Sequence, residues 1–266
     1  MSDRTESTAP VLYEKRDDGV AIVTLNRPAR LNALSGPLLD ALAETVEAIA
    51  RDPEVRVFLL RGVPRPDGRP CFSAGVDVQA FAEGRGVTEE QGFALTNRID
   101  DLLKPSIAVI DGVCTTGGAE LALACDFRLV ARTARISDWH LAKLGTGLGS
   151  WGASTRWARE CGVTNAKQML LTGREIDGDE AFRIGFASGV FESASLESAA
   201  LDMARRIAGM NPDGVRLTLA HLDRVGDMSR DQALNWAKLS AEWLGVGVTE
   251  AELKGKVLGR RRDDAG

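Results

Sequence analysis

The sequence lacks long apolar runs, paired-cysteine motifs and a serine-hydrolase turn, and each absence excludes a class of protein. No apolar stretch approaches the ~18 residues that a membrane-spanning helix needs. The four cysteines have no Cys-x-x-Cys or metal-like spacing, which predicts reduced thiols, no metal site and a cytoplasmic location. No Gly-x-Ser-x-Gly motif occurs, and the only histidines are His140 and His221, so a serine hydrolase is disfavoured.

The composition is that of an ordinary globular chain. Hydrophobic residues make up 44% and charged residues 27% of the 266 positions, and this length is enough for one large domain or for a domain with an appendage. The net charge of −5 gives no reason to expect a nucleic-acid or membrane partner. Residues 1–10 are polar without an apolar centre, so we expect a disordered tail rather than a signal peptide or anchor.

Strand and helix patterns alternate to about residue 192, and the pattern is helical afterwards. Alternating residues 11–14 and 20–25 flank Asp17-Asp18-Gly19, which predicts a β-hairpin. Ser35 is placed to cap a helix that runs to about Arg51. The predicted organisation is a tail over 1–10, an α/β core over 11–195 and a helical C-terminal domain over 196–266. Within that last part, the expected helices span 196–209, 212–225 and 230–244.

The stretch from Asp111 to Asp126 carries the strongest chemical signal. A β-branched run leads into Gly117-Gly118, and an apolar helix follows with Glu120 in its first turn. A carboxylate in that setting costs on the order of several kcal/mol unless it is neutral, paired or hydrogen-bonded. Paired glycines let the backbone approach a ligand and direct N–H groups at it. The plain alternative for Glu120 is an acid that complements the helix dipole.

Four motifs in order resemble the crotonase (enoyl-CoA hydratase/isomerase) superfamily over residues 11–245. They are Asn26-Arg27-Pro28 with Asn32-Ala33-Leu34, then Phe72-Ser73-Ala74-Gly75-Val76-Asp77, then Gly117-Gly118-Ala119-Glu120-Leu121 with Cys125-Asp126, and Leu170-Leu171-Thr172-Gly173. The resemblance implies an α/β spiral of repeated ββα units with a C-terminal helical trimerisation domain. It also implies a homotrimer or dimer of trimers, an acyl-CoA thioester substrate, and no cofactor, since coenzyme A is part of the substrate.

The resemblance assigns a role to each matching position. The backbone N–H groups of Ala74 and Gly117 would hold the thioester oxygen, and preorganised donors stabilise an enolate by several kcal/mol. Glu120 would be the general acid/base. The residues implied for substrate and coenzyme A binding are Arg27, Arg30, Asn32, Ala33, Ser73, Gly75, Asp77 and Gly118. Taken alone, Ser73 to Gly75 is more simply explained as a tight turn, and the alternative for Arg27 is a brace for its own loop. The basic tail at residues 254–262 is a further candidate for phosphate contacts.

The sequence departs from the family where hydratases carry a second catalytic glutamate. That window contains no glutamate. Counting forward from Ile136 puts His140 at the acid position, whereas counting back from Leu144-Gly145 puts Leu141 there. His140 suits proton transfer near neutral pH, and Asp138 would orient it if the segment is extended. The alternative is that His140 simply packs in its loop. Nearby, Trp139 and Trp151 are candidates for shaping a bulky pocket.

The leading interpretation is a lyase of the enoyl-CoA hydratase type, which adds water to a 2-enoyl-CoA through an oxyanion-stabilised enolate. The displaced second acid leaves a one-carboxylate member of the family as an alternative: a double-bond isomerase, a thioester hydrolase or a C–C hydrolase. A non-catalytic acyl-CoA-binding protein is the third interpretation, and Glu120 argues against it.

Overall fold

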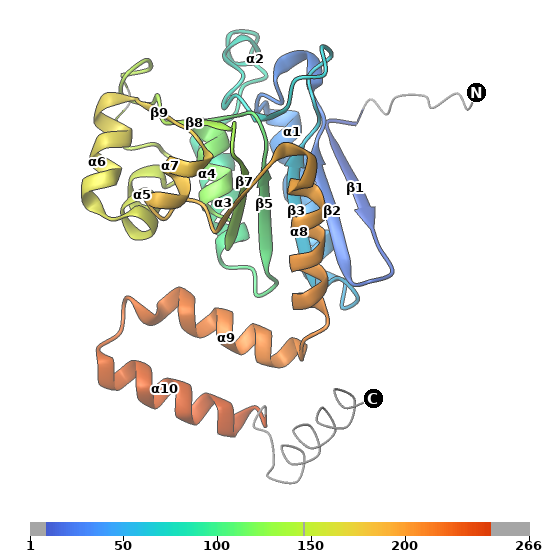
Figure 1. The fold of residues 1–266 in the computed structure, drawn as a ribbon, viewed down its shortest axis with the longest axis vertical. Helices are drawn as coiled ribbons and strands as arrows, with labels where there is room; N and C mark the ends of the chain where they lie inside the picture. Colours follow the sequence, from blue (N-terminus) through green and yellow to red (C-terminus); the bar gives the residue numbers. More distant parts are fainter. Residues whose placement is uncertain (1–8, 146, 246–266) are drawn as a thin grey trace. The chain divides into compact units, whose positions relative to one another are not determined.

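The computed structural model describes residues 9–145 and 147–245 and has the predicted α/β spiral (Figure 1). The strands form two sheets, in the orders β1-β2-β3-β5-β7-β10 and β4-β6-β8-β9. The chain passes from the larger sheet to the smaller one at β3 to β4, β5 to β6 and β7 to β8. Each passage supplies one strand to each sheet, and this repetition generates the ββα units.

The elements have these bounds. The strands are β1 (Val11–Lys15), β2 (Val20–Leu25), β3 (Val57–Gly62), β4 (Cys71–Ser73), β5 (Ser106–Ile110), β6 (Val113–Thr115), β7 (Phe127–Ala131), β8 (Arg135–Ser137), β9 (Glu175–Ile176) and β10 (Gly189–Phe191). The helices are α1 (Gly36–Arg51), α2 (Val78–Ala82), α3 (Glu89–Asp100), α4 (Gly117–Leu123), α5 (Ala153–Cys161), α6 (Val163–Thr172), α7 (Gly178–Arg183), α8 (Ser193–Ala208), α9 (Pro212–Val225) and α10 (Arg230–Trp243).

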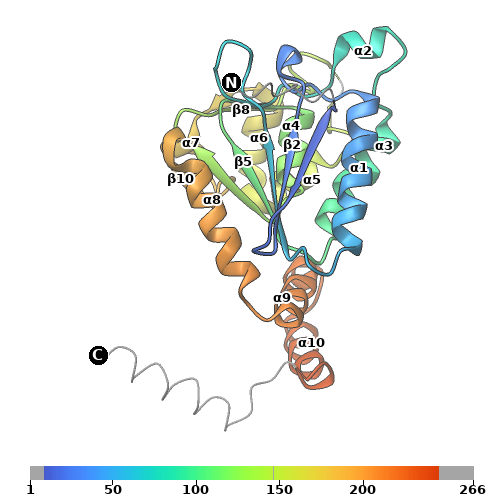
Figure 2. The same ribbon diagram turned by 90° about the vertical axis from the view of Figure 1, so that its right-hand side faces the viewer.

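Helices cover both faces of the six-stranded sheet, so its inner strands are apolar almost throughout. β1 and β2 form the predicted antiparallel hairpin, and β2, β3, β5, β7 and β10 then pair in parallel. Helices α1 and α3 lie on one face and α8 on the other (Figure 2). The inner strands β2, β3, β5 and β7 are therefore largely buried, whereas the outer strands β1 and β10 are partly exposed. No helix among the described residues is long and apolar enough to cross a membrane.

The boundary between the two compact units differs from the predicted one. It falls between Gly209 and Met210 rather than between residues 195 and 196. The reason is a stripe of buried small and apolar side chains on α8, at Leu196, Ala200, Ala204 and Ala208, which packs this helix onto the large sheet. The second unit contains α9 and α10, close to their predicted spans. The residues of the expected N-terminal tail before Ala9 and those from 246 on lie outside the described residues.

Candidate active site

Three adjacent parallel strands of the small sheet deliver the candidate catalytic residues to one edge. β4, β6 and β8 pair in this order. Their carboxyl ends lead into residues 74–77, 116–120 and 138–140 respectively. Because the carboxyl ends of parallel strands share an edge, residues far apart in sequence meet there. This topology explains why the second, third and displaced-acid motifs belong to a single site.

Glu120 is buried, and both of its carboxylate oxygens have polar partners. Its side chain lies in the all-buried helix α4, and the residue is 1% exposed. Oε1 accepts hydrogen bonds from the backbone N–H groups of Trp151, at 3.0 Å, and Ala153, at 3.1 Å. Gly149 lies against the same oxygen, since a methyl group built on it would be 2.9 Å from Oε1. The buried carboxylate is thus hydrogen-bonded, as its setting in the sequence required.

His140 stands opposite Glu120 and joins it to Asp138. Its Nε2 lies 3.3 Å from Oε2 of Glu120, and its Nδ1 lies 2.8 Å from Oδ1 of Asp138. Leu141, the other position reached by counting, is exposed. A neutral imidazole can donate from only one nitrogen, whereas an imidazolium donates from both. Two carboxylates on the two ring nitrogens therefore favour the protonated ring.

Electrostatics lead to the same protonation state. Burial lowers the pKa of His140, but hydrogen bonds and charge from Asp138 and then Glu120 outweigh this effect and raise that pKa from 6.5 to about 10. The second oxygen of Asp138, Oδ2, is buried and has no hydrogen-bond partner among the described residues. The charge on Asp138 is consequently directed mainly at His140. At neutral pH, the site holds an imidazolium between two acids.

The backbone donors differ from the predicted pair in one member. The N–H of Ala74 donates to the carbonyl of Leu31 at 3.0 Å, so it is not available to a thioester oxygen. Val76 forms a parallel bridge with Leu34. The N–H of Leu34 donates to the carbonyl of Gly75, and the N–H of Asp77 donates to the carbonyl of Leu34, so the N–H of Val76 points away from Leu34.

Within the described residues, the N–H groups of Val76 and Gly117 donate to no protein acceptor. The two segments touch, since a methyl group on Gly75 would be 3.4 Å from Gly117 N. Val76 therefore replaces Ala74 as the candidate donor beside Gly117.

Thr116 holds a strained backbone immediately before Gly117. Its φ of 55° and ψ of −117° are unusual for a β-branched residue, and such conformations cost roughly 1–3 kcal/mol. We expect Thr116→Gly to raise the free energy of unfolding by about 1 kcal/mol, because glycine adopts this conformation freely but loses more chain entropy. Urea denaturation measures the change. Thr115→Gly, in the regular strand β6, is the control and should destabilise. Equal destabilisation by both changes would contradict a strained Thr116.

Most residues implied for coenzyme A binding hold each other. Buried Asn32 donates to the carbonyls of Val63, at 2.8 Å, and Cys71, at 2.9 Å. Ser73 donates to the carbonyl of Asn32 and accepts from Gly75 N. Gly118 lets α4 approach β4, since a methyl group there would be 2.8 Å from Ser73 O. These positions build the frame of the site.

The arginine loop combines a brace with an exposed cation. Arg27 forms an ion pair with Asp77 at 2.7 Å and donates to the carbonyl of Ala33 at 2.5 Å. Asp77 also caps α2 by accepting from Ala80 N. Arg30 is exposed and donates to Gln79. The predicted cations at 254–262 lie outside the described residues.

A cavity of about 750 Å³ adjoins the catalytic groups. Its lining includes Glu120, His140, Ala74, Val76 and Thr116. Most of the remaining lining is apolar or aromatic: Val78, Phe81, Val87, Trp139, Leu144, Leu148 and Trp151, with Glu89 and Lys143 as the further charges. A volume of this size and character suits a largely apolar ligand with a polar reacting end.

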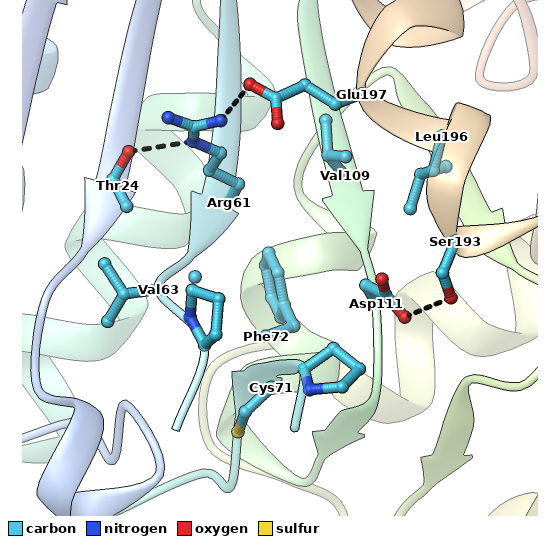
Figure 3. A pocket seen from close by; sticks show the side chains of 13 residues that line it. Thr24, Arg61, Val63, Cys71, Phe72, Val109, Asp111, Ser193, Leu196 and Glu197 are labelled. Atoms are coloured by element: carbon cyan, nitrogen blue, oxygen red, sulfur yellow. Dashed lines mark hydrogen bonds and ion pairs between the residues drawn. The ribbon is translucent and has the colours of Figure 1, made fainter. Parts of the chain in front are cut away.

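A second cavity, of about 250 Å³, lies beside the start of α8 (Figure 3). Its polar side chains pair with one another: Arg61 donates to Thr24 and Glu197, and Ser193 donates to Asp111. None of the candidate catalytic residues lines it. Nor do the described residues contain a group of three or more His, Cys, Asp and Glu side chains that could hold a metal ion. The larger cavity is therefore the candidate active site.

The backbone donors at Val76, Trp151 and Ala153 were not predicted from the sequence. Any residue except proline offers an N–H, so residue type gives no signal for these three. The glycine-rich stretch around Gly149 and Gly152 was the one available indication, because it marks close backbone packing. Trp151 itself had been expected near the site.

Comparisons with known proteins identify related chains and folds. Residues 15–240 match the enoyl-CoA hydratase/isomerase family model. The chain is 33% identical to the short-chain-enoyl-CoA hydratase of Clostridium acetobutylicum over 84% of this chain and 85% of that protein. Enoyl-CoA hydratase from Bacillus anthracis superposes with a TM-score of 0.83 at 27% identity, covering 95% of this chain and 96% of that one. A monofunctional enoyl-CoA isomerase from M. smegmatis superposes with a TM-score of 0.73 at 31% identity, over 85% and 99%.

Proposed function

The chain belongs to the enoyl-CoA hydratase/isomerase family, and we propose that it hydrates 2-enoyl-CoA thioesters with Glu120 and His140 as the proton-transfer pair. The observation that carries the proposal is the 3.3 Å contact between these two side chains, in a cavity that also exposes the segment of Val76. The candidate oxyanion donors, Val76 N–H and Gly117 N–H, lie on adjoining segments. The two amides would therefore polarise the carbonyl of the same thioester to which Glu120 and His140 transfer protons.

The reaction follows from these positions. Glu120 takes a proton from water as the water oxygen bonds to C3, and the C2=C3 electrons move onto the thioester oxygen. The amides of Val76 and Gly117 stabilise the resulting enolate. When the enolate collapses, C2 takes a proton from the His140 imidazolium. The proton on Glu120 then passes across the 3.3 Å contact to His140, which restores both groups.

A direct assay tests the proposal. Incubation with crotonyl-CoA should remove the absorbance of the conjugated thioester and yield the 3-hydroxyacyl product. The second candidate, a double-bond isomerase, is supported by the absence of a second glutamate and by the structural match to an isomerase. A 3-enoyl-CoA should then be converted to the 2-enoyl-CoA without water addition. Binding of acyl-CoA with no turnover of either thioester would favour the binding-protein interpretation.

We expect Asp138→Asn to move the alkaline limit of activity. Asp138 makes the largest contribution that raises the pKa of His140, so its loss should lower that pKa from about 10. The alkaline limb of kcat should then shift down by roughly 1–2 pH units. Initial rates above the non-enzymatic background, from pH 6 to about pH 10.5, measure it. Asp179→Asn, at an exposed ion pair with Arg132, is the control. An unmoved limb would refute the coupling.

The same proton links pH to folding. The folded-state pKa of His140 lies above its ordinary 6.5. The stability that its contacts contribute is therefore fully present below pH 6.5 and is lost as the pH rises through about 10.

For the ligand and the assembly, the structure offers two supporting observations. Exposed Arg30 suits contact with the phosphates of coenzyme A, while Arg27 is engaged as a brace. In the second unit, α9 has no buried residue, and Leu222, Leu234 and Trp243 are exposed. Apolar side chains in that state favour contacts between copies of the chain. A homotrimer or dimer of trimers is the expected assembly, and light scattering measures it.

A further inference from the structure

The indole of Trp151 is wedged between two helices at the inner wall of the 750 Å³ cavity. Trp151 is 3% exposed and lines that cavity. On one side it lies against α3, where a methyl group built on Gly92 would be 1.8 Å from Cε2. On the other side it lies against α4, where a methyl group on Gly117 would be 2.9 Å from Cζ3. Glycine at both positions makes room for the ring.

The backbone of Trp151 is fixed on both sides of the residue. Its N–H donates to Glu120, and its carbonyl accepts from Thr96 Oγ1 at 2.9 Å and from Arg156 Nη1 at 2.6 Å. Arg156 is itself held by an ion pair with Asp100 at 2.9 Å. The indole cannot leave its place by a shift of the main chain without breaking these contacts, so it is a rigid wall.

The outer part of the cavity is lined differently. Val78 and Phe81 on α2, together with Leu144 and Leu148 on the segment after β8, are all more than half exposed. Atoms of a ligand that reach this rim remain partly in water. The part of the cavity that Trp151 bounds, together with Glu120 and His140, is lined by buried side chains.

We propose that Trp151 sets the inner limit of the acyl site and makes the protein selective for short 2-enoyl thioesters. This rests on the proposed function, which puts the thioester oxygen at Gly117, the residue that the indole contacts. An acyl chain that continues inward meets the ring within its first carbons. A longer chain must turn to the exposed rim, where each methylene left in water forfeits roughly fourfold in kcat/KM relative to a buried one.

The test is the ratio of kcat/KM for trans-2-octenoyl-CoA to that for crotonyl-CoA. Wild type should favour crotonyl-CoA. Trp151→Ala should raise the ratio by about tenfold or more, the discrimination that a few methylenes in an apolar pocket provide. A general loss of activity or stability lowers both values and cancels in the ratio. Trp157→Phe is the matched control: Trp157 is buried and stacks on Phe186, but it does not line the cavity.

Gly92→Ala supplies a second variant with the indole intact. The added methyl group must displace the ring, so the melting temperature should fall in the wild-type background. In the Trp151→Ala background, the same change should be tolerated, because the space beside Gly92 is empty. Equal losses in the two backgrounds would refute the wedge. An active Trp151→Ala protein with an unchanged chain-length ratio would overturn the proposal.

Failure of the proposed function can be recognised separately. If wild type turns over neither thioester, calorimetry with butyryl-CoA and octanoyl-CoA still measures the pocket. Trp151→Ala should then strengthen octanoyl-CoA binding relative to butyryl-CoA by several-fold. An unchanged ratio of the two dissociation constants would refute the role of Trp151 without reference to catalysis.

Discussion

Glu120→Gln should lower kcat for the hydration of crotonyl-CoA by ~10²-fold or more while butyryl-CoA still binds. The glutamine oxygen can accept the same hydrogen bonds from Trp151 N and Ala153 N, so the fold around it should persist. An amide cannot take a proton from water, however, and the step at C3 loses its base. Stopped-flow absorbance gives the rate, and calorimetry gives the binding constant.

The cavity provides a matched control for that variant. Glu89 also lines it, at the start of α3, but it is exposed and is not paired with His140. Glu89→Gln should change kcat by no more than a few-fold. If Glu120→Gln turns over crotonyl-CoA at the wild-type rate, Glu120 is not the base. If both variants lose activity equally, the loss reflects the charge of the cavity rather than one proton-transfer group.

His140→Ala should lower kcat by a comparable ~10²-fold, because C2 of the enolate loses its proton donor. Glu120 also loses the partner that restores its ionised form after each turnover. The double variant Glu120→Gln/His140→Ala should be little worse than either single variant, since groups that act as a unit are not additive. Steady-state kinetics with all three proteins measures this.

The second histidine controls for loss of an imidazole elsewhere. His221 stacks on Trp236 in the second unit and is not part of the candidate site. His221→Gln should leave kcat within a few-fold of wild type. Full additivity of the two site variants would show that Glu120 and His140 act independently, and a fully active His140→Ala protein would restore the one-carboxylate interpretation.

The sequence predicts the fold and the site correctly where the signal is local. Glu120 lies in a short apolar helix after two glycines, so its burial and its need for partners follow from its neighbours in the chain. His140 and Asp138 are two residues apart, and a pairing of the two was one of the two alternatives that this spacing offered; the structure has their side chains in contact at 2.8 Å. The strand–turn–helix order is likewise carried by local patterns, which the observed elements reproduce closely.

The sequence does not predict features that depend on hydrogen bonding or packing between distant segments. Whether the N–H of Ala74 or of Val76 is available is decided by Leu31 and Leu34, some forty residues earlier, which bond to alternate groups of the 74–77 segment. The unit boundary has a similar origin, because α8 continues the helical pattern of the C-terminal part yet packs on the sheet.

The main chain and the side chain of residue 151 have different roles. Its main-chain N–H holds Glu120, and its side chain fills the space beside Gly92. Every amino acid except proline has an N–H that can donate to Glu120, whatever its side chain does to the space beside Gly92. Single substitutions at this position can therefore change the acyl chain-length preference while the hydrogen bond that holds Glu120 is kept. A saturation library at position 151 should yield active variants with graded chain-length preference, with proline the most damaging member.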